Sequence, residues 1–248
     1  MQAIKNYLRE FKLAGMVNSV EERIAYANSN NLSFNQFLKM LCEDEMSNRQ
    51  DNGYKKRYAK AKLPGHKTLE EFDFNFQPSI DKKQINDAAT GQYIEQKKNL
   101  VFIGNPGTGK THLAIALALK ALGQNKKVLF TTTSDLLLQL HTSKADNSYY
   151  KRLEDYLAPD LLVLDELGFQ RLPDYSVKDF FDVISKRYEH GAMIITTNKE
   201  CSQWHEIFND PVLSAAILDR VMHHAIIFKI NGQSYRRKNL VKNSGKND

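Results

Sequence analysis

The sequence contains only two cysteines among its 248 residues, Cys42 and Cys201, and neither belongs to a C-x-x-C pair. This scarcity argues against a cysteine-based zinc site and against a disulfide framework, and it fits a reducing compartment. No apolar run approaches the roughly 20 residues that span a bilayer. The first residues, MQAIKNYLRE, also lack the apolar segment of a signal peptide. We therefore expect a cytoplasmic protein that has no membrane partner.

Basic residues outnumber acidic ones, 35 to 29, which gives a formal net charge of +6. An excess of this size favours a polyanionic partner such as nucleic acid, but surface solubility explains it equally well. Residues 54–67, YKKRYAKAKLPGHK, combine cations with two tyrosines and contain no acid. We expect nucleic-acid contact here, with a solvated surface as the alternative. The predicted DNA-binding residues are Lys55, Lys56, Arg57, Lys60 and Lys62.

Apolar residues recur at helical intervals in the first part of the chain, up to about Met46. A second helix is expected to open at Ser33, because Gln36 follows three positions later, as in a capping box. Its apolar face is expected to consist of Phe34, Phe37, Leu38 and Leu41. The predicted division of the chain is a helical domain at 1–52, a basic linker at 53–67, a core at 68–240 and a disordered tail at 241–248.

After Thr68, apolar strand patterns alternate with helical patterns. Such alternation predicts an α/β core in which helices flank a parallel sheet of five strands. The expected strands are 99–104, 127–133, 161–166, 193–198 and 225–230. One expected helix starts at Thr111, and three others are expected at 134–140, 174–189 and 211–221.

The segment GNPGTGKT, at 104–111, matches the P-loop pattern G-x-x-x-x-G-K-[ST] between an expected strand and an expected helix. Its backbone N–H groups and the following helix N-terminus are suited to bind phosphates. Lys110 supplies a cation to the phosphates, and Thr111 offers a hydroxyl to Mg²⁺. ATP and Mg²⁺ are therefore the expected cofactors. The predicted nucleotide-binding residues are Gly104, Asn105, Pro106, Gly107, Thr108, Gly109, Lys110, Thr111 and His112.

Polar residues end two other expected strands. Asp165 and Glu166 close the run LLVLDE and are expected at the carboxyl edge of the sheet, beside the P-loop. Asp165 is the predicted metal ligand, direct or through water, and Glu166 is suited to polarise the attacking water. Asn198 ends the next strand and is expected to contact that water or the γ-phosphate. A simple strand-capping role is the alternative for these residues.

The motifs GNPGTGKTHLA, LLVLDELG, TTN, AAILDRVMHHA and GQSYRRK together resemble the IstB-like ATP-binding proteins. These are AAA+ ATPases that assist transposition of bacterial insertion sequences, and they are related to DnaC-type helicase loaders. The segment AKLPGHKTLEEFDFNFQPSID strengthens the resemblance, which covers nearly the whole chain. The resemblance implies a homo-oligomer with ATP at subunit interfaces, double-stranded DNA as ligand and a transposase as partner.

The resemblance also assigns two arginines. Arg220 corresponds to an arginine finger that reaches a neighbouring subunit's ATP, and Arg236 to a sensor of its own subunit's nucleotide, with Arg237 as the rival for that role. Only 18 residues follow Ile230, so no full helical lid is expected. His223 and His224 show no third ligand in the sequence, so we expect them to pack or face solvent.

Three functions remain open at this stage. The first is a transposition helper that oligomerises on double-stranded DNA and engages a transposase. The second is a DnaC-like helicase loader, which would bind single-stranded DNA. The third, a metabolic P-loop kinase, is disfavoured by the paired acids of LLVLDE and by the missing lid.

Overall fold

The structure of the chain is a computed structural model that describes residues 1–170, 172–208 and 210–237. The chain divides into two compact units, Met1–Lys56 and Arg57–Asp248. The predicted tail at 241–248 lies outside the described residues. Among the described residues, no helix combines the length and the apolar character needed to cross a membrane.

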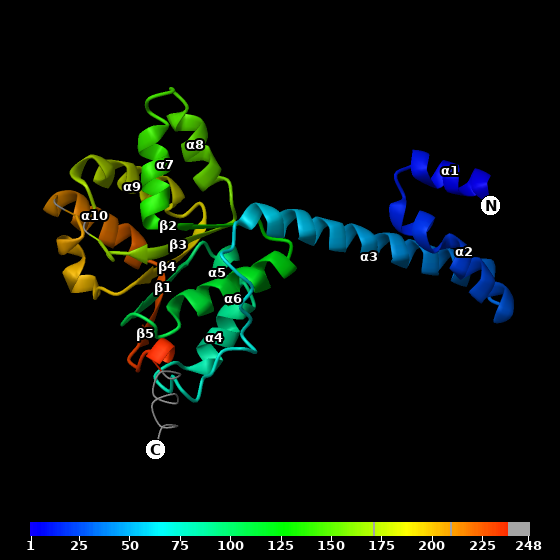
Figure 1. Cartoon of the computed structure of the whole chain (residues 1–248), viewed down its shortest axis with the longest axis horizontal. Helices are drawn as coiled ribbons and strands as arrows, with labels where there is room; N and C mark the ends of the chain where they lie inside the picture. Colours follow the sequence, from blue (N-terminus) through cyan, green and yellow to red (C-terminus); the bar gives the residue numbers. More distant parts are fainter. Residues whose placement is uncertain (171, 209, 238–248) are drawn as a thin grey trace, which may run out of the picture. The chain divides into compact units, whose positions relative to one another are not determined.

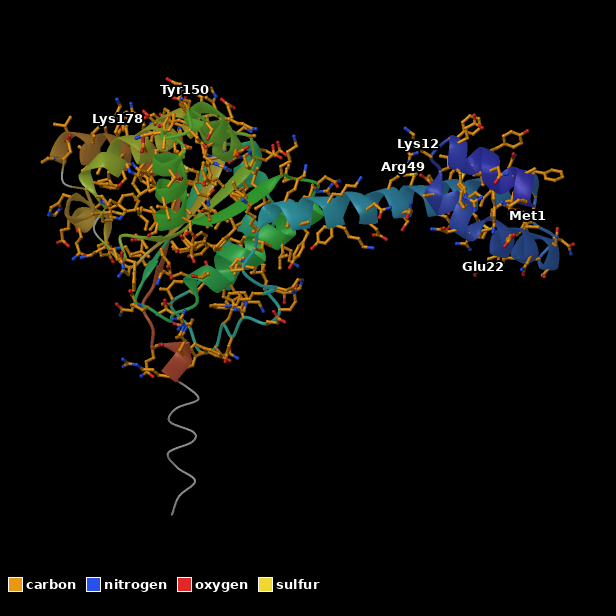
Figure 2. The ribbon with its side chains drawn as sticks, turned by 45° about the horizontal axis from the view of Figure 1, so that its top comes forward. Met1, Lys12, Glu22, Arg49, Tyr150 and Lys178 are labelled. Atoms are coloured by element: carbon orange, nitrogen blue, oxygen red, sulfur yellow. The ribbon has the colours of Figure 1, made fainter. Side chains whose placement is uncertain are left out.

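The first unit is helical, as predicted. It contains α1 (Gln2–Glu10), α2 (Ala14–Ser29) and the larger part of α3 (Phe34–Ala61). The predicted capping box is confirmed, because the Ser33 backbone N–H donates to Gln36 Oε1 at 2.9 Å and the Gln36 N–H donates to Ser33 Oγ at 3.3 Å. Figure 2 shows these helices with their side chains.

The apolar face predicted for α3 is only partly buried. Leu41 is buried, whereas Phe34 is 93% exposed and Leu38 is 58% exposed. The reason is that α2 approaches α3 further along, where a Cβ on Gly15 would lie 2.6 Å from Glu45 Cα. The buried Glu45 carboxylate accepts the Gly15 N–H there, at 2.7 Å.

The helix α3 continues without a break through the predicted boundary between residues 52 and 53, and it ends at Ala61. The next residue, Lys62, has the left-handed φ of +54° that commonly follows a helix end. The basic stretch is therefore mostly helical, because nothing in residues 54–61 breaks a helix before Pro64.

The second unit is built on the predicted parallel five-stranded sheet, whose order is β2-β3-β4-β1-β5. The inner strands β1, β3 and β4 are almost wholly buried, which explains their continuous apolar runs. The strands are β1 (Asn99–Gly104), β2 (Val128–Thr132), β3 (Leu161–Leu167), β4 (Ala192–Thr197) and β5 (Ala225–Ile230).

Helices cover both faces of the sheet (Figure 1). On one face lie α4 (Lys82–Ala89), α5 (Gln92–Glu95) and α6 (Lys110–Gly123). On the other lie α7 (Thr133–Thr142), α8 (Tyr149–Leu157), α9 (Asp174–Arg187) and α10 (Pro211–Met222), with the 3₁₀ helix η1 (Cys201–Glu206) beside α10. Four elements that are short or mostly polar, α4, α5, α8 and η1, were not predicted from the sequence. Tyr150 at the start of α8 is 79% exposed and lies on the outer surface (Figure 2).

A buried arginine forms hydrogen bonds near the amino ends of β3 and β4. Arg187, at the end of α9, is 1% exposed. Its guanidinium donates to the carbonyls of Tyr156, Leu157, Pro159 and Ala192 at 2.8 to 3.1 Å. Burial lowers the pKa of Arg187 to about 10. This side chain therefore holds the end of α8, the turn before β3 and the start of β4 together.

Replacing Arg187 by Met should destabilise the fold by about 3 kcal/mol or more, because four carbonyls lose a charged donor. The measurement is urea unfolding followed by circular dichroism. Lys186→Met removes the same kind of charge from the exposed neighbouring residue and should change stability by less than about 0.5 kcal/mol. Equal midpoints for the two variants would contradict this role of Arg187.

Candidate nucleotide-binding site

The P-loop lies between the end of β1 and the start of α6, as predicted. Two of its glycines have positive φ values, +81° for Gly107 and +101° for Gly109. A Cβ on Gly109 would lie 2.6 Å from the Phe72 ring, and one on Gly107 would collide with Ser234 Oγ. Both the backbone conformation and the close packing therefore require glycine.

Lys110 is held by the loop that precedes it. Its Nζ donates to the carbonyls of Gly104 at 2.7 Å and Asn105 at 2.9 Å. Burial lowers the pKa of Lys110, and the nearby Arg236 acts in the same direction, whereas Asp165 and Glu166 oppose the shift. The Lys110 ammonium group thus lies near Asp165, Glu166 and Arg236, which are all predicted to act at the phosphates.

Asp165 is the centre of a hydrogen-bond network at the carboxyl edge of the sheet. Thr111 Oγ1 lies 3.0 and 3.1 Å from the two oxygens of this buried carboxylate, and Thr196 Oγ1 also donates to Oδ1. The network joins α6, β3 and β4, and it brings the two predicted metal ligands together. Thr196 was not among the predicted site residues, although it lies in the TTN segment that indicated this strand end.

Glu166 is turned out of the strand by a bulge. The pairing of β3 with β4 is irregular between Leu164 and Leu167, and Glu166 has a φ of +62°. Its side chain is exposed, although both sequence neighbours are buried. Thr196 Oγ1 also accepts the Glu166 N–H at 3.0 Å. Unusual backbone of this kind is found at functional sites, where surrounding contacts hold it in place.

Two neighbouring cavities surround the P-loop. A cavity of about 90 Å³ contains most of the residues predicted to act on the γ-phosphate, which are Lys110, Thr111, Glu166, Asn198 and Arg236. A second cavity, of about 200 Å³, is lined by P-loop residues together with Phe72, Asp73, Gln77, His112 and Tyr235. The first is suited to phosphates, and the second offers aromatic and polar groups to a base.

The two candidate sensor arginines lie differently with respect to these cavities. Arg236 lines both cavities, whereas Arg237 lines neither. The backbone explains the position of Arg236, because the Tyr235 N–H donates to Gly107 O at 2.9 Å. This bond attaches the segment after β5 directly to the P-loop. Up to Arg237, that segment forms only a short helical turn, so the described residues contain no lid bundle.

Arg220 lies on α10 and lines neither cavity. Its Nη1 donates to Ala216 O at 3.0 Å, and its guanidinium lies 5.1 Å from the centre of the Phe181 ring. The structure therefore does not bring Arg220 to the phosphate cavity of its own subunit.

The structure also shows the surroundings of Arg57, from the basic stretch, and of the two adjacent histidines. Arg57 Nη2 donates to Leu122 O at 3.3 Å and Asn125 Oδ1 at 2.6 Å, so this predicted DNA-binding residue also ties the last turns of α3 to the end of α6. His223 and His224 are exposed, as predicted, but Glu189 lies close enough to form a three-residue cluster with them. Tyr188 OH lies 2.7 Å from His223 Nδ1 beside this cluster.

The family model described as "IstB-like ATP binding protein" matches residues 6–243. The chain belongs to this family. It is 38% identical to an ATP-binding protein of insertion sequence IS5376 from Geobacillus stearothermophilus, over 95% of this chain and 94% of the relative. It is 37% identical to that of IS21 from Pseudomonas aeruginosa, over 96% and 90%. The chain is thus an AAA+ ATPase of the kind encoded by insertion sequences.

Solved structures support the same fold. The DnaC helicase loader superposes with a TM-score of 0.53 at 24% identity, over 60% of this chain and 87% of that one. AMPPCP-bound DnaA from Aquifex aeolicus gives a TM-score of 0.57 at 18% identity, over 75% and 57%. These likenesses confirm the P-loop α/β core.

Thr196→Val should lower ATP turnover by about tenfold or more, because it frees both the Asp165 carboxylate and the Glu166 backbone from their shared partner. Nucleotide affinity should change much less, since the P-loop is untouched. The measurement is steady-state hydrolysis together with binding of a fluorescent ATP analogue. Thr131→Val, at a buried threonine in β2, is the matched control. Unchanged turnover in Thr196→Val would contradict the positioning role.

Proposed function

We propose that this ATPase is a transposition helper that assembles on double-stranded DNA with ATP at its subunit interfaces and engages a transposase. The observation that carries the proposal is the composition of the phosphate cavity. The cavity contains the chain's own phosphate-binding, metal-binding and water-orienting groups but not Arg220. In this proposal Arg220 of a neighbouring subunit adds a further cation to Lys110 and Arg236, which already line the cavity.

The residues at the P-loop fit Mg²⁺. The Thr111 hydroxyl and the Asp165 carboxylate are hard oxygen donors, the type that Mg²⁺ prefers. Thr111 Oγ1 and Asp165 Oδ1 lie 3.0 Å apart, so the two oxygen donors are close enough to face one ion. In our proposal Thr111 and Asp165 hold the ion, directly or through water, and the ion neutralises phosphate charge.

The remaining groups have separate roles in hydrolysis. The Lys110 ammonium exchanges its two carbonyl partners for phosphate oxygens. Glu166, exposed at the bulge, orients and polarises the attacking water, and Asn198 holds that water or a γ-phosphate oxygen. Arg236 lines both cavities and would register which nucleotide is bound.

Assembly follows from the position of Arg220. In this proposal α10 of one subunit faces the phosphate cavity of the next, and Arg220 stabilises the charge that develops on the γ-phosphate. Bound ATP therefore stabilises the oligomer, and hydrolysis favours its dissociation. The relatives' association with insertion sequences supports transposition as the process and a transposase as the partner.

Arg220→Ala should abolish most ATP turnover while leaving nucleotide binding by each subunit intact. Mixing it with Glu166→Gln subunits should restore activity, because mixed interfaces combine an intact arginine with an intact glutamate. The measurement is hydrolysis as a function of mixing ratio, with each variant alone as the control. Full turnover by Arg220→Ala alone would exclude the action on a neighbouring subunit.

The unaltered protein should bind duplex DNA more tightly than single strands, and ATP should strengthen binding because an oligomer presents many basic segments. Fluorescence anisotropy across a salt series measures both effects. Lys55→Ala combined with Lys56→Ala should reduce the slope of log K against log salt by about 2, since each lysine neutralises about one phosphate. A clear preference for single strands would instead support a helicase loader.

A further inference from the structure

A third cavity lies at the edge of the sheet opposite to the P-loop. Its volume is about 430 Å³, and it is lined by residues from the end of α3, the start of β2, α7 and α8. The cavity residue Lys127 immediately precedes β2, which begins at Val128. The cavity residue Pro159 lies two positions before β3, which begins at Leu161. All strands of the sheet are parallel, so this is the amino edge, whereas Asp165 and the P-loop lie at the carboxyl edge.

Positive charge dominates the lining of this cavity. Its charged residues are the cations Arg57, Lys60, Lys62, Lys127 and Arg152 and a single acid, Asp155. That acid is paired with Arg152 at 3.0 Å, and both partners are substantially exposed. An exposed pair of this kind is weak and can exchange partners readily.

Three of the cations have no competing partner within the described part of the chain. Among the described residues, the ammonium groups of Lys60, Lys62 and Lys127 have no side-chain partner. The backbone N–H of Lys127 donates to the neighbouring Asp160 carboxylate at 2.7 Å. By contrast, the adjacent Lys126 is paired with Glu95. Unpaired cations gathered in a hollow raise the local concentration of anions more than the same charges spread over a convex surface.

We propose that this amino-edge cavity binds the phosphodiester backbone of duplex DNA. The inference rests on the proposed function and extends it, because Lys127 and Arg152 lie outside the basic stretch that the sequence marked. These two residues and Lys60 and Lys62 come from three separate elements, so the fold assembles a site that the sequence does not display. Phosphate oxygens of the DNA pair with the ammonium groups of the lysines. Arg152 exchanges its ion pair with Asp155 for one with a phosphate.

The location has a mechanistic consequence. DNA held at the amino edge leaves the carboxyl edge open to nucleotide, so one subunit can bind both ligands at once. Most of the polar groups that line the cavity are cations, which suit phosphates more than base edges, so we expect binding there to depend little on base sequence.

The test is a matched pair of double variants measured by anisotropy with duplex and single-stranded oligonucleotides across a salt series. Lys127→Ala combined with Arg152→Ala removes two cations from the cavity. Lys126→Ala combined with Lys151→Ala removes two cations from the adjacent residues, which do not line it. The first should reduce the slope of log K against log salt for duplex DNA by about 2 and weaken binding by roughly ten- to fiftyfold at 0.1 M salt. The second should change both quantities much less.

Two further measurements keep the result interpretable. ATP turnover without DNA should match the parent in both variants, because the cavity is remote from the phosphate site. Lys127→Arg combined with Arg152→Lys keeps both charges and should retain duplex binding. Equal affinities of the two alanine variants, or a loss confined to single strands, would overturn the assignment of the cavity. Absence of DNA binding by the unaltered protein would instead overturn the proposed function itself.

Discussion

The Asp165 carboxylate and its two threonine partners are the constraint on which the rest of the site depends. A buried carboxylate is costly unless its oxygens accept hydrogen bonds, and here Thr111 and Thr196 supply them. These bonds fix α6 and β4 relative to the end of β3. The Thr196 hydroxyl also accepts the Glu166 N–H, and this contact stabilises the bulge that exposes the glutamate. One network thus positions the predicted metal ligands and the predicted water-orienting group together.

The sheet could be predicted because its inner strands β1, β3 and β4 are buried on both faces. LLVLDEL has no alternative to a central strand flanked by helices, and the P-loop between β1 and α6 fixes the direction of the chain. Elements without such a signal were missed. The helix α8 is mostly polar and short, and its packing against α7 and α9 stabilises it. Phe34 was predicted on an apolar face but is exposed, because an apolar residue at helical spacing is buried only where another element covers it.

The individual motifs of the site could be predicted, but not the tertiary contacts that connect them. The residue types after β1 and β3 indicate phosphate and metal chemistry whatever the surroundings. The choice between Arg236 and Arg237 depends instead on a backbone bond from Tyr235 to Gly107, which connects residues distant in sequence. Thr196 was missed for the same reason, since a strand threonine gains its role only from the register of β4 against β3. Contacts of this kind follow from tertiary structure and leave no local pattern.

The two edges of the sheet separate the two polyanions that this protein is proposed to bind. Triphosphate would lie at the carboxyl edge, where helix N-termini and the P-loop offer N–H groups. The amino edge offers cationic side chains, which suit a longer and less specific ligand. In the proposed arrangement the two ligands lie at opposite edges of the sheet and do not contact each other. Coupling of ATP to DNA affinity would then arise from assembly, because each added subunit presents another basic cavity to the same duplex and the contacts act together.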